Sequence, residues 1–114
     1  MLRRFVILQH DHPYLHWDLL LEEESSARTW RLLRKPCLGE PIAAERLPDH
    51  RLMYLDYEGP VSGERGNVKR FLAGTYEPIS DQPDFLAIGL KDNSLAESAA
   101  IWTLKDGRLF VFFA

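Results

Sequence analysis

Short apolar stretches alternate with polar ones along the chain, and this pattern predicts a series of short strands. Several of the apolar runs end near Gly, Pro, Asp or Asn, which is typical of strands joined by turns. Residues 41–47 differ, because Ala43, Ala44 and Glu45 favour a short helix that Pro48 would end. The expected strands are residues 4–9, 15–22, 28–34, 53–57, 67–76, 85–91, 100–105 and 108–113.

Turn residues between these stretches predict how the strands are connected. Residues 11–13 separate the first two strands, since Asp hydrogen-bonds its own backbone and Pro fixes φ. Residues 62–66 form a glycine-bracketed loop, Gly74 marks a kink or a break within 67–76, and the Asp-Gly pair at 106–107 predicts a type I′ hairpin. Such a row of short strands indicates a barrel or a sandwich. We expect a mostly β fold, a compact antiparallel β-barrel with one or two short helices.

Composition narrows the class of protein. The chain has 114 residues, 46% of them hydrophobic and 27% charged, and residues 1–114 are expected to form a single domain, since one domain usually takes roughly 100–200 residues. The apolar runs are far shorter than a membrane-spanning helix, and Cys37 is the single cysteine, so we expect a cytoplasmic protein with no membrane partner. The net charge of −3 argues against non-specific coating of duplex DNA but permits a local phosphate site.

Side-chain alternation within residues 15–22 separates an apolar face from a polar one. The apolar face, which must enter a core, consists of Trp17, Leu19 and Leu21. It forces His16 and Asp18 onto the opposite face, where imidazole and carboxylate can bind one cation, with His10 returning across the turn as a third ligand. Two His and one carboxylate leave open positions, as catalytic metal sites require. Alternatively, His16 and Asp18 form a solvated pair on an exposed strand, which the spacing alone favours.

A second group consists of His50 and Tyr54, four residues apart. Both could contact a phosphate, His50 as a cation or acid and Tyr54 as a hydroxyl donor. The alternative, favoured by the spacing alone, is that His50 caps a helix and Tyr54 is a half-buried strand aromatic. A basic stretch at residues 28–35 could approach a nucleic-acid backbone, or could be the charged face of an edge strand. Its cations are Arg28, Arg31, Arg34 and Lys35.

Five short motifs follow one another along most of the chain. They comprise Phe5-Val6, His10-Asp11, Leu15-His16, Asp18 and Leu21-Glu22; then Trp30, Arg34 and Pro36; then Asp49-His50, Leu52, Tyr54 and Tyr57-Glu58-Gly59; then Gly66 and Val68; and then Gly74-Thr75-Tyr76. In this order they resemble the 3′-phosphoesterase domain of bacterial DNA ligase D, and the first and third motifs are specific.

This resemblance implies a compact β-barrel that binds a divalent metal, usually Mn²⁺ with Zn²⁺ or Co²⁺ as alternatives, and trims damaged 3′ ends of DNA. The family removes a terminal ribonucleotide and then the 3′-phosphate, leaving a 3′-hydroxyl for end joining. Carried over by position, His10, His16 and Asp18 would bind the metal, and His50 and Tyr54 would be the catalytic residues that hold the phosphate. The expected partners are DNA or RNA/DNA 3′ ends and end-joining repair proteins.

Three departures from the family pattern bear on activity. The family has an arginine two residues after the metal-binding aspartate, where this chain has Leu20, which cannot bind phosphate. The residues upstream of the first strand have no counterpart before Phe5, and the segment after Glu-Gly is shortened to residues 60–67. The chain is therefore expected to be a stand-alone phosphoesterase-like protein of DNA repair with weakened or altered activity.

Two other functions remain open at this stage. One is a non-catalytic member of the fold that binds nucleic acid or a protein, and the other is a metalloenzyme acting on a different phosphoester. If Arg46, Arg51 or Arg65 takes the place of the missing arginine, catalysis is expected to survive. If Leu20 borders an open pocket, Leu20→Arg is expected to restore the phosphate contact and to raise turnover on 3′-phosphate ends.

Overall fold

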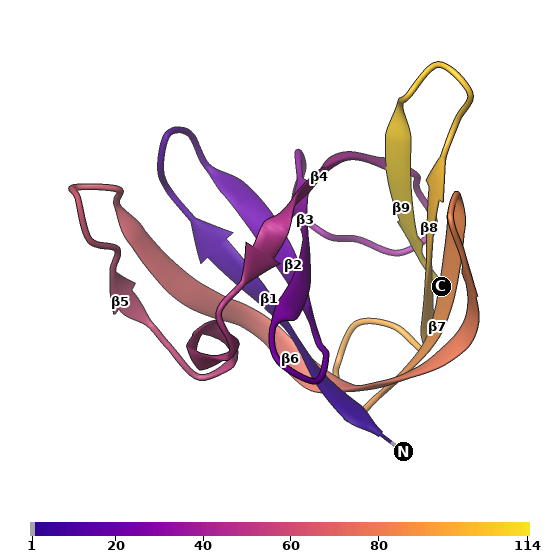
Figure 1. The fold of residues 1–114 in the computed structure, drawn as a ribbon, viewed down its shortest axis with the longest axis horizontal. Helices are drawn as coiled ribbons and strands as arrows, with labels where there is room; N and C mark the ends of the chain where they lie inside the picture. The colour runs from indigo at the N-terminus through magenta and orange to yellow at the C-terminus, as the bar shows by residue number, and fades with distance from the viewer. Residues whose placement is uncertain (1) are drawn as a thin grey trace.

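The computed structural model describes residues 2–114, which form nine strands and one short 3-10 helix (Figure 1). No helix in this part of the chain has the length and apolar character needed to cross a membrane. The elements are β1 (Arg3–His10), β2 (His16–Glu22), β3 (Ala27–Leu32), β4 (Ile42–His50), η1 (Leu52–Leu55), β5 (Gly59–Pro60), β6 (Asn67–Gln82), β7 (Phe85–Lys91), β8 (Ser98–Thr103) and β9 (Leu109–Phe113).

Antiparallel pairing closes eight of these strands into a barrel. The hydrogen-bonded order is β1-β2-β3-β4-β9-β8-β7-β6, and β6 pairs again with β1, which confirms the expected architecture. The two-residue β5 adds to β6 at Gly59 and Pro60. Strand β6 is continuous and passes from β1 to β7 near Gly74, where a Cβ would overlap the carbonyl oxygen of Lys91. Glycine at this position therefore permits the close approach of two strands.

The barrel interior is filled by alternate side chains from all eight strands. On β2 these are the three predicted residues, Trp17, Leu19 and Leu21. Because side chains alternate along a strand, His16, Asp18 and Leu20 point to the outer face, as the sequence predicted. The register of this strand is confirmed.

A second apolar cluster covers part of the outer surface of the barrel. It joins Leu20 on β2 with Val6 and Leu8 on β1, and η1 contributes Leu55 from above. As a result β2 is covered on both faces, and every residue from His16 to Leu21 is buried. The expected solvated strand face at His16 and Asp18 is therefore wrong, since the two residues are 0% and 3% exposed.

Two predicted elements have a different conformation in the structure. Within residues 41–47, predicted as a helix, residues 42–47 belong to strand β4, because Ile42 and Ala44 both point into the barrel and fill space between β3 and β9. Intrinsic helix preference of a few tenths of a kcal/mol per residue is easily overridden by such packing. Residues 53–57, predicted as a strand, contain most of η1, whose Leu55 packs on the outer cluster.

The hairpin between β8 and β9 is confirmed, but its turn type is not I′. The Gly107 N–H donates to the Leu104 carbonyl at 2.9 Å, and the Leu104 N–H donates to the Arg108 carbonyl at 2.7 Å. Between Leu104 and Arg108, only Gly107 has positive φ (91°), whereas type I′ needs two such residues. This combination is a type I turn followed by a glycine bulge.

Candidate metal centre and phosphate cleft

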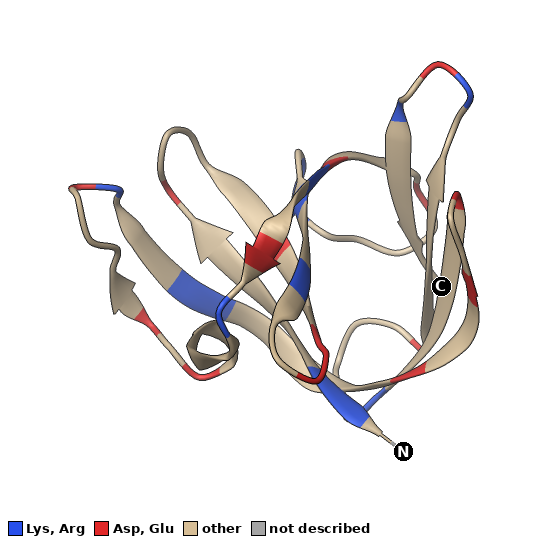
Figure 2. Cartoon of the chain, viewed as in Figure 1, with Lys and Arg blue, Asp and Glu red and all other residues tan. Residues whose placement is uncertain are grey.

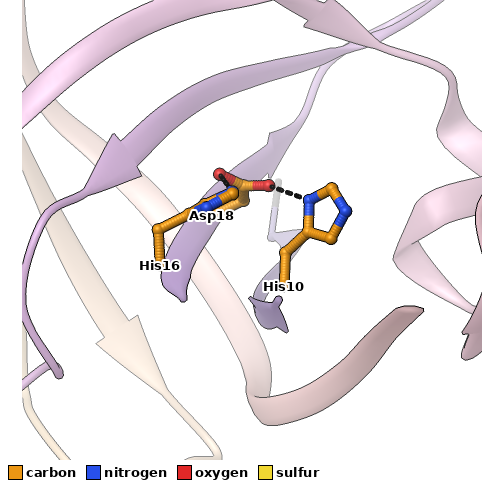
Figure 3. Close-up of side chains that lie close together, drawn as sticks. All are labelled: His10, His16 and Asp18. Carbon is orange, nitrogen blue, oxygen red and sulfur yellow. Dashed lines mark ion pairs between the residues drawn. The ribbon is translucent and has the colours of Figure 1, made fainter. Parts of the chain in front are cut away.

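The three predicted metal ligands lie together on the outer face of the barrel (Figure 3). His10 ends β1 and His16 begins β2, so the two residues face each other as ladder partners across the intervening turn. Asp18 lies two residues further along β2 on the same face. One ligand atom from each side chain lies within 4.8 Å of the other two. Strand pairing thus brings together residues that are eight positions apart in the sequence.

Backbone carbonyl groups orient both imidazoles. His16 Nδ1 lies 2.8 Å from the Tyr14 carbonyl oxygen and His10 Nε2 lies 2.8 Å from that of Arg65. A carbonyl only accepts, so each of these nitrogens carries the proton in the neutral ring, and the other nitrogen presents a lone pair. These inner nitrogens face the carboxylate: His16 Nε2 is 3.3 Å from Asp18 Oδ1, and His10 Nδ1 is 3.7 Å from Asp18 Oδ2.

This arrangement leaves buried lone pairs without a hydrogen. Among the described residues, His16 Nε2 and Asp18 Oδ1 have no hydrogen-bond partner, and their side chains are 0% and 4% exposed. Two acceptors facing each other in a buried site are unfavourable unless a cation or proton lies between them. A two-His, one-carboxylate donor set with outer nitrogens bonded to carbonyls fits a divalent transition metal. The residues present can therefore hold such an ion.

The charges in the group agree with a ligand role for Asp18. Burial alone would raise the pKa of Asp18, but hydrogen bonds from His10 and His16, which form when those rings are protonated, lower it to about 2. Asp18 in turn raises the pKa of His10 above its usual 6.5, against the opposing effect of burial. Asp18 is thus ionised at neutral pH, which is the form that binds a metal.

A cleft of about 440 Å³ joins this group to the second predicted cluster. His50 ends β4 and Tyr54 lies in η1, and their rings meet edge to face with centroids 5.8 Å apart. Both line the cleft together with His10 and Asp18, whereas His16 lies fully buried beneath it. The structure therefore places all five sequence-predicted site residues at one location. His50 is not a helix cap, and Tyr54 is not on a strand.

Leu20 does not border this cleft. It is fully buried in the outer cluster among Val6, Leu8 and Leu55, so the condition for Leu20→Arg to restore a phosphate contact is not met. Of the arginines named from the sequence as substitutes, Arg51 and Arg65 line the cleft. Arg46 instead lies over the Trp30 ring.

Sequence reasoning missed Arg31, which also lines the cleft. The sequence groups it with a basic stretch, but the cations of that stretch have different partners. Arg28 pairs with Glu23 and Asp81, and Arg34 pairs with Glu40. Figure 2 shows Lys and Arg spread over several strands and loops. The signal for Arg31 is the strand register, since its Cα is the ladder partner of Asp18.

Comparison with known proteins identifies the family of this chain. The family model described as "DNA Ligase D 3′-phosphoesterase domain" matches residues 8–110. The multifunctional non-homologous end joining protein LigD of Pseudomonas aeruginosa is 30% identical over 93 residues, which cover 77% of this chain. The match spans 11% of that much longer protein. The chain belongs to the family of DNA ligase D 3′-phosphoesterase domains.

Proposed function

We propose that the chain is a metal-dependent phosphoesterase that removes a 3′-phosphate, or a 3′-ribonucleotide, from nucleic-acid ends in DNA repair. One observation carries this proposal. The buried, unpartnered His16 Nε2 and Asp18 Oδ1 converge with His10 on the floor of a cleft that His50 and Tyr54 also line. A set of metal-binding lone pairs beside a histidine and a phenol suits phosphate-ester hydrolysis.

His10, His16 and Asp18 would hold the metal, for which Mn²⁺ is the proposed ion and Zn²⁺ or Co²⁺ are alternatives. A divalent ion in such a site polarises phosphoryl oxygens and lowers the pKa of water. The three side chains contribute a single negative charge, that of Asp18, so an ion held there keeps a net positive charge toward a phosphate.

His50 and Tyr54 would act on the substrate phosphate from the other part of the cleft. In hydrolysis, water adds to phosphorus, the bond from phosphorus to the 3′ oxygen breaks, and that oxygen gains a proton. An imidazolium at His50 can stabilise the phosphate charge and donate that proton, while the Tyr54 hydroxyl donates a hydrogen bond to a phosphoryl oxygen. The Tyr57 ring packs edge to face on Tyr54, with ring centroids 5.7 Å apart.

The dimensions of the cleft fit a terminal nucleotide. Small-molecule sites usually enclose about 300–1,000 Å³, and the cleft lies within that range. Besides its ionisable groups, it presents Leu8, Leu47, Val61 and Val68, which can contact the sugar and the base. The relative's name refers to non-homologous end joining. We therefore propose DNA or RNA/DNA 3′ ends as the substrates and end-joining proteins as the partners.

Leu20 favours one competing function. Because the family pattern has an arginine there, its replacement suits a binding module that recognises 3′ ends through the same cleft without hydrolysing them. Binding of a 3′-phosphate end without release of phosphate would identify this function.

The decisive experiment measures phosphate release from a DNA primer that ends in a 3′-phosphate, with Mn²⁺ and with EDTA. We expect release only with the metal, and none from an Asp18→Asn variant. Asp49→Asn is the matched control, because Asp49 lines the same cleft but lies outside the three-residue group. If the wild-type chain releases no phosphate with Mn²⁺, Zn²⁺ or Co²⁺, the proposed activity is wrong.

A further inference from the structure

We propose that Arg31 on β3 binds the terminal phosphate, supplying from the neighbouring strand the cation that the family pattern places two residues after the metal-binding aspartate. This inference rests on the proposed function, since it assigns a further phosphate contact in the same cleft. It also explains how that cleft can work with Leu20 in the chain.

The pairing of β2 with β3 sets the position of Arg31. Its Cα is the direct ladder partner of Asp18. Directly paired residues project to the same face of a sheet, with Cβ atoms about 4.5–5.5 Å apart. Arg31 therefore lies on the outer face beside Asp18 and lines the cleft with His10 and His50. The positive charge of Arg31 therefore reaches the site from β3, whereas the family pattern places its arginine on the same strand as the aspartate.

The guanidinium of Arg31 has a hydrogen-bond donor without a partner among the described residues. Within residues 2–114, its Nε is buried without a partner, and no carboxylate lies within ion-pair distance of it. Its contacts are with Tyr14: Nη1 is 3.4 Å from the Tyr14 hydroxyl, and the guanidinium lies over the ring at 5.6 Å from its centroid. A buried, unpaired donor is costly, and phosphate oxygens match the planar fork of guanidinium.

The other arginines of the cleft are less suited to this role. The Arg65 side chain is held by Ser62, through Nε to its carbonyl at 2.6 Å and through Nη2 to its hydroxyl at 3.2 Å. Arg51 is exposed, so water and salt weaken its attraction for an anion. Arg31 is partly buried, carries no ion pair among the described residues and lies beside Asp18.

The surroundings of Leu20 differ from those of Arg31 in a way that fits this assignment. Leu20 lies on the same face as Asp18, but it is fully buried in a cluster with apolar side chains of β1 and η1. An aliphatic residue suits that environment, while the partly open position opposite Asp18 suits a charged one. The chain thus has a leucine where the surroundings are dry and an arginine where the cleft opens.

The test compares the affinities of a DNA primer ending in 3′-phosphate and one ending in 3′-hydroxyl, measured by fluorescence anisotropy with Mn²⁺. Loss of a charge-assisted hydrogen bond lowers affinity roughly ten- to hundredfold, so Arg31→Ala should reduce the preference for 3′-phosphate by that factor. Arg31→Lys should retain part of it, because lysine keeps the charge without the fork. Arg108→Ala is the matched control, since Arg108 lies in the β8–β9 loop and pairs with Asp106.

The melting temperature and its increase with Mn²⁺ should be unchanged in Arg31→Ala, which excludes a merely structural effect. If the wild type prefers 3′-phosphate but Arg31→Ala keeps the full preference, or Arg51→Ala loses more of it, the role of Arg31 is wrong and the proposed function stands. If the wild type neither prefers the 3′-phosphate primer nor releases phosphate from it, both proposals are wrong.

Discussion

Replacing Asp18 by asparagine tests the metal centre with almost no change in shape. The side chain is 4% exposed, and one of its oxygens faces the bare Nε2 of His16 at 3.3 Å. An asparagine amide can donate to that nitrogen, which an ionised carboxylate cannot do. In metal-free protein at pH 8, we therefore expect the free energy of unfolding to stay within about 1 kcal/mol of the wild type.

The effect on metal binding should be large, because the substitution removes the single negative charge among the three ligands. A metal at one hundred times its Kd stabilises the folded state by about 2.7 kcal/mol, which raises the melting temperature of a domain of this size by roughly 10 °C. Loss of a residue that only supports a ligand already costs about 10–100-fold in affinity. At a hundredfold loss, the same metal concentration gives about 0.4 kcal/mol, or less than about 2 °C.

The assay is thermal unfolding at pH 8 with and without Mn²⁺, repeated with Zn²⁺. Asp49→Asn carries the same charge change on the same cleft, where Asp49 is bonded to Ser26 and Arg46 instead of the histidines, so its metal response should equal that of the wild type. An Asp18→Asn variant that keeps the full metal response would show that the ion binds elsewhere. A wild type whose melting temperature ignores millimolar metal would refute the site itself.

Three further predictions concern His50, His10 and Leu20. His50→Gln should lower release of 3′-phosphate by about 10²–10⁴-fold, measured as turnover, while the melting response to metal stays intact. The pKa of His10 is raised in the folded state, so its contribution to stability is complete below the unfolded value of about 6.5 and is lost as pH rises through the higher folded value. Melting curves from pH 6 to 8 should thus show metal-free protein losing stability while the increment from Mn²⁺ grows, and an increment independent of pH would contradict histidine ligation. Leu20→Arg should lower the free energy of unfolding by about 2–5 kcal/mol in urea titrations, as for loss of a buried leucine, without raising turnover; a gain in turnover would contradict the role of Arg31.

The alternation of apolar and polar residues along β2 predicts from the sequence which of its side chains face the barrel interior. Trp17, Leu19 and Leu21 form an apolar set with period two, and only a strand places such a set on one face. His16 and Asp18 then had to share the other face, and the structure agrees. Their burial was not predictable in this way, because it depends on how the strands and loops around them pack, and alternation within one strand does not determine that.

Strand β4 shows where local preference fails. Ala43, Ala44 and Glu45 favour a helix in isolation, yet Ile42 and Ala44 are two residues apart and both enter the barrel. The barrel needs a strand between β3 and β9, a requirement that arises only from the whole fold. The 3-10 turn that replaces the expected strand at residues 53–57 likewise depends on the outer cluster beneath it.

The length of the loop between β2 and β3 determines which residue of β3 lies opposite Asp18. The sequence placed residues 23–27 in the connection before the third strand, whereas the structure pairs Glu22 with Ala27 and leaves residues 23–26 as the loop. This difference of one residue decides whether Asp18 lies opposite Arg31 or its neighbour. Because successive side chains point to opposite faces, it also decides which residue joins the site.

The segment at residues 60–67 contributes to the candidate site through its backbone. Its Arg65 carbonyl fixes the ring of His10, and its Asn67 N–H donates to the Asp11 carboxylate at 2.8 Å, which ties this segment to the β1–β2 turn. Gly66 has φ of 75°, and a Cβ there would overlap the Asp11 side chain, so a glycine allows the two loops to meet. The β1–β2 turn in turn supplies the Tyr14 carbonyl that orients His16. Main-chain groups of two docked loops thus orient both imidazoles of the candidate metal group, so this geometry depends on the packing of the two loops against each other.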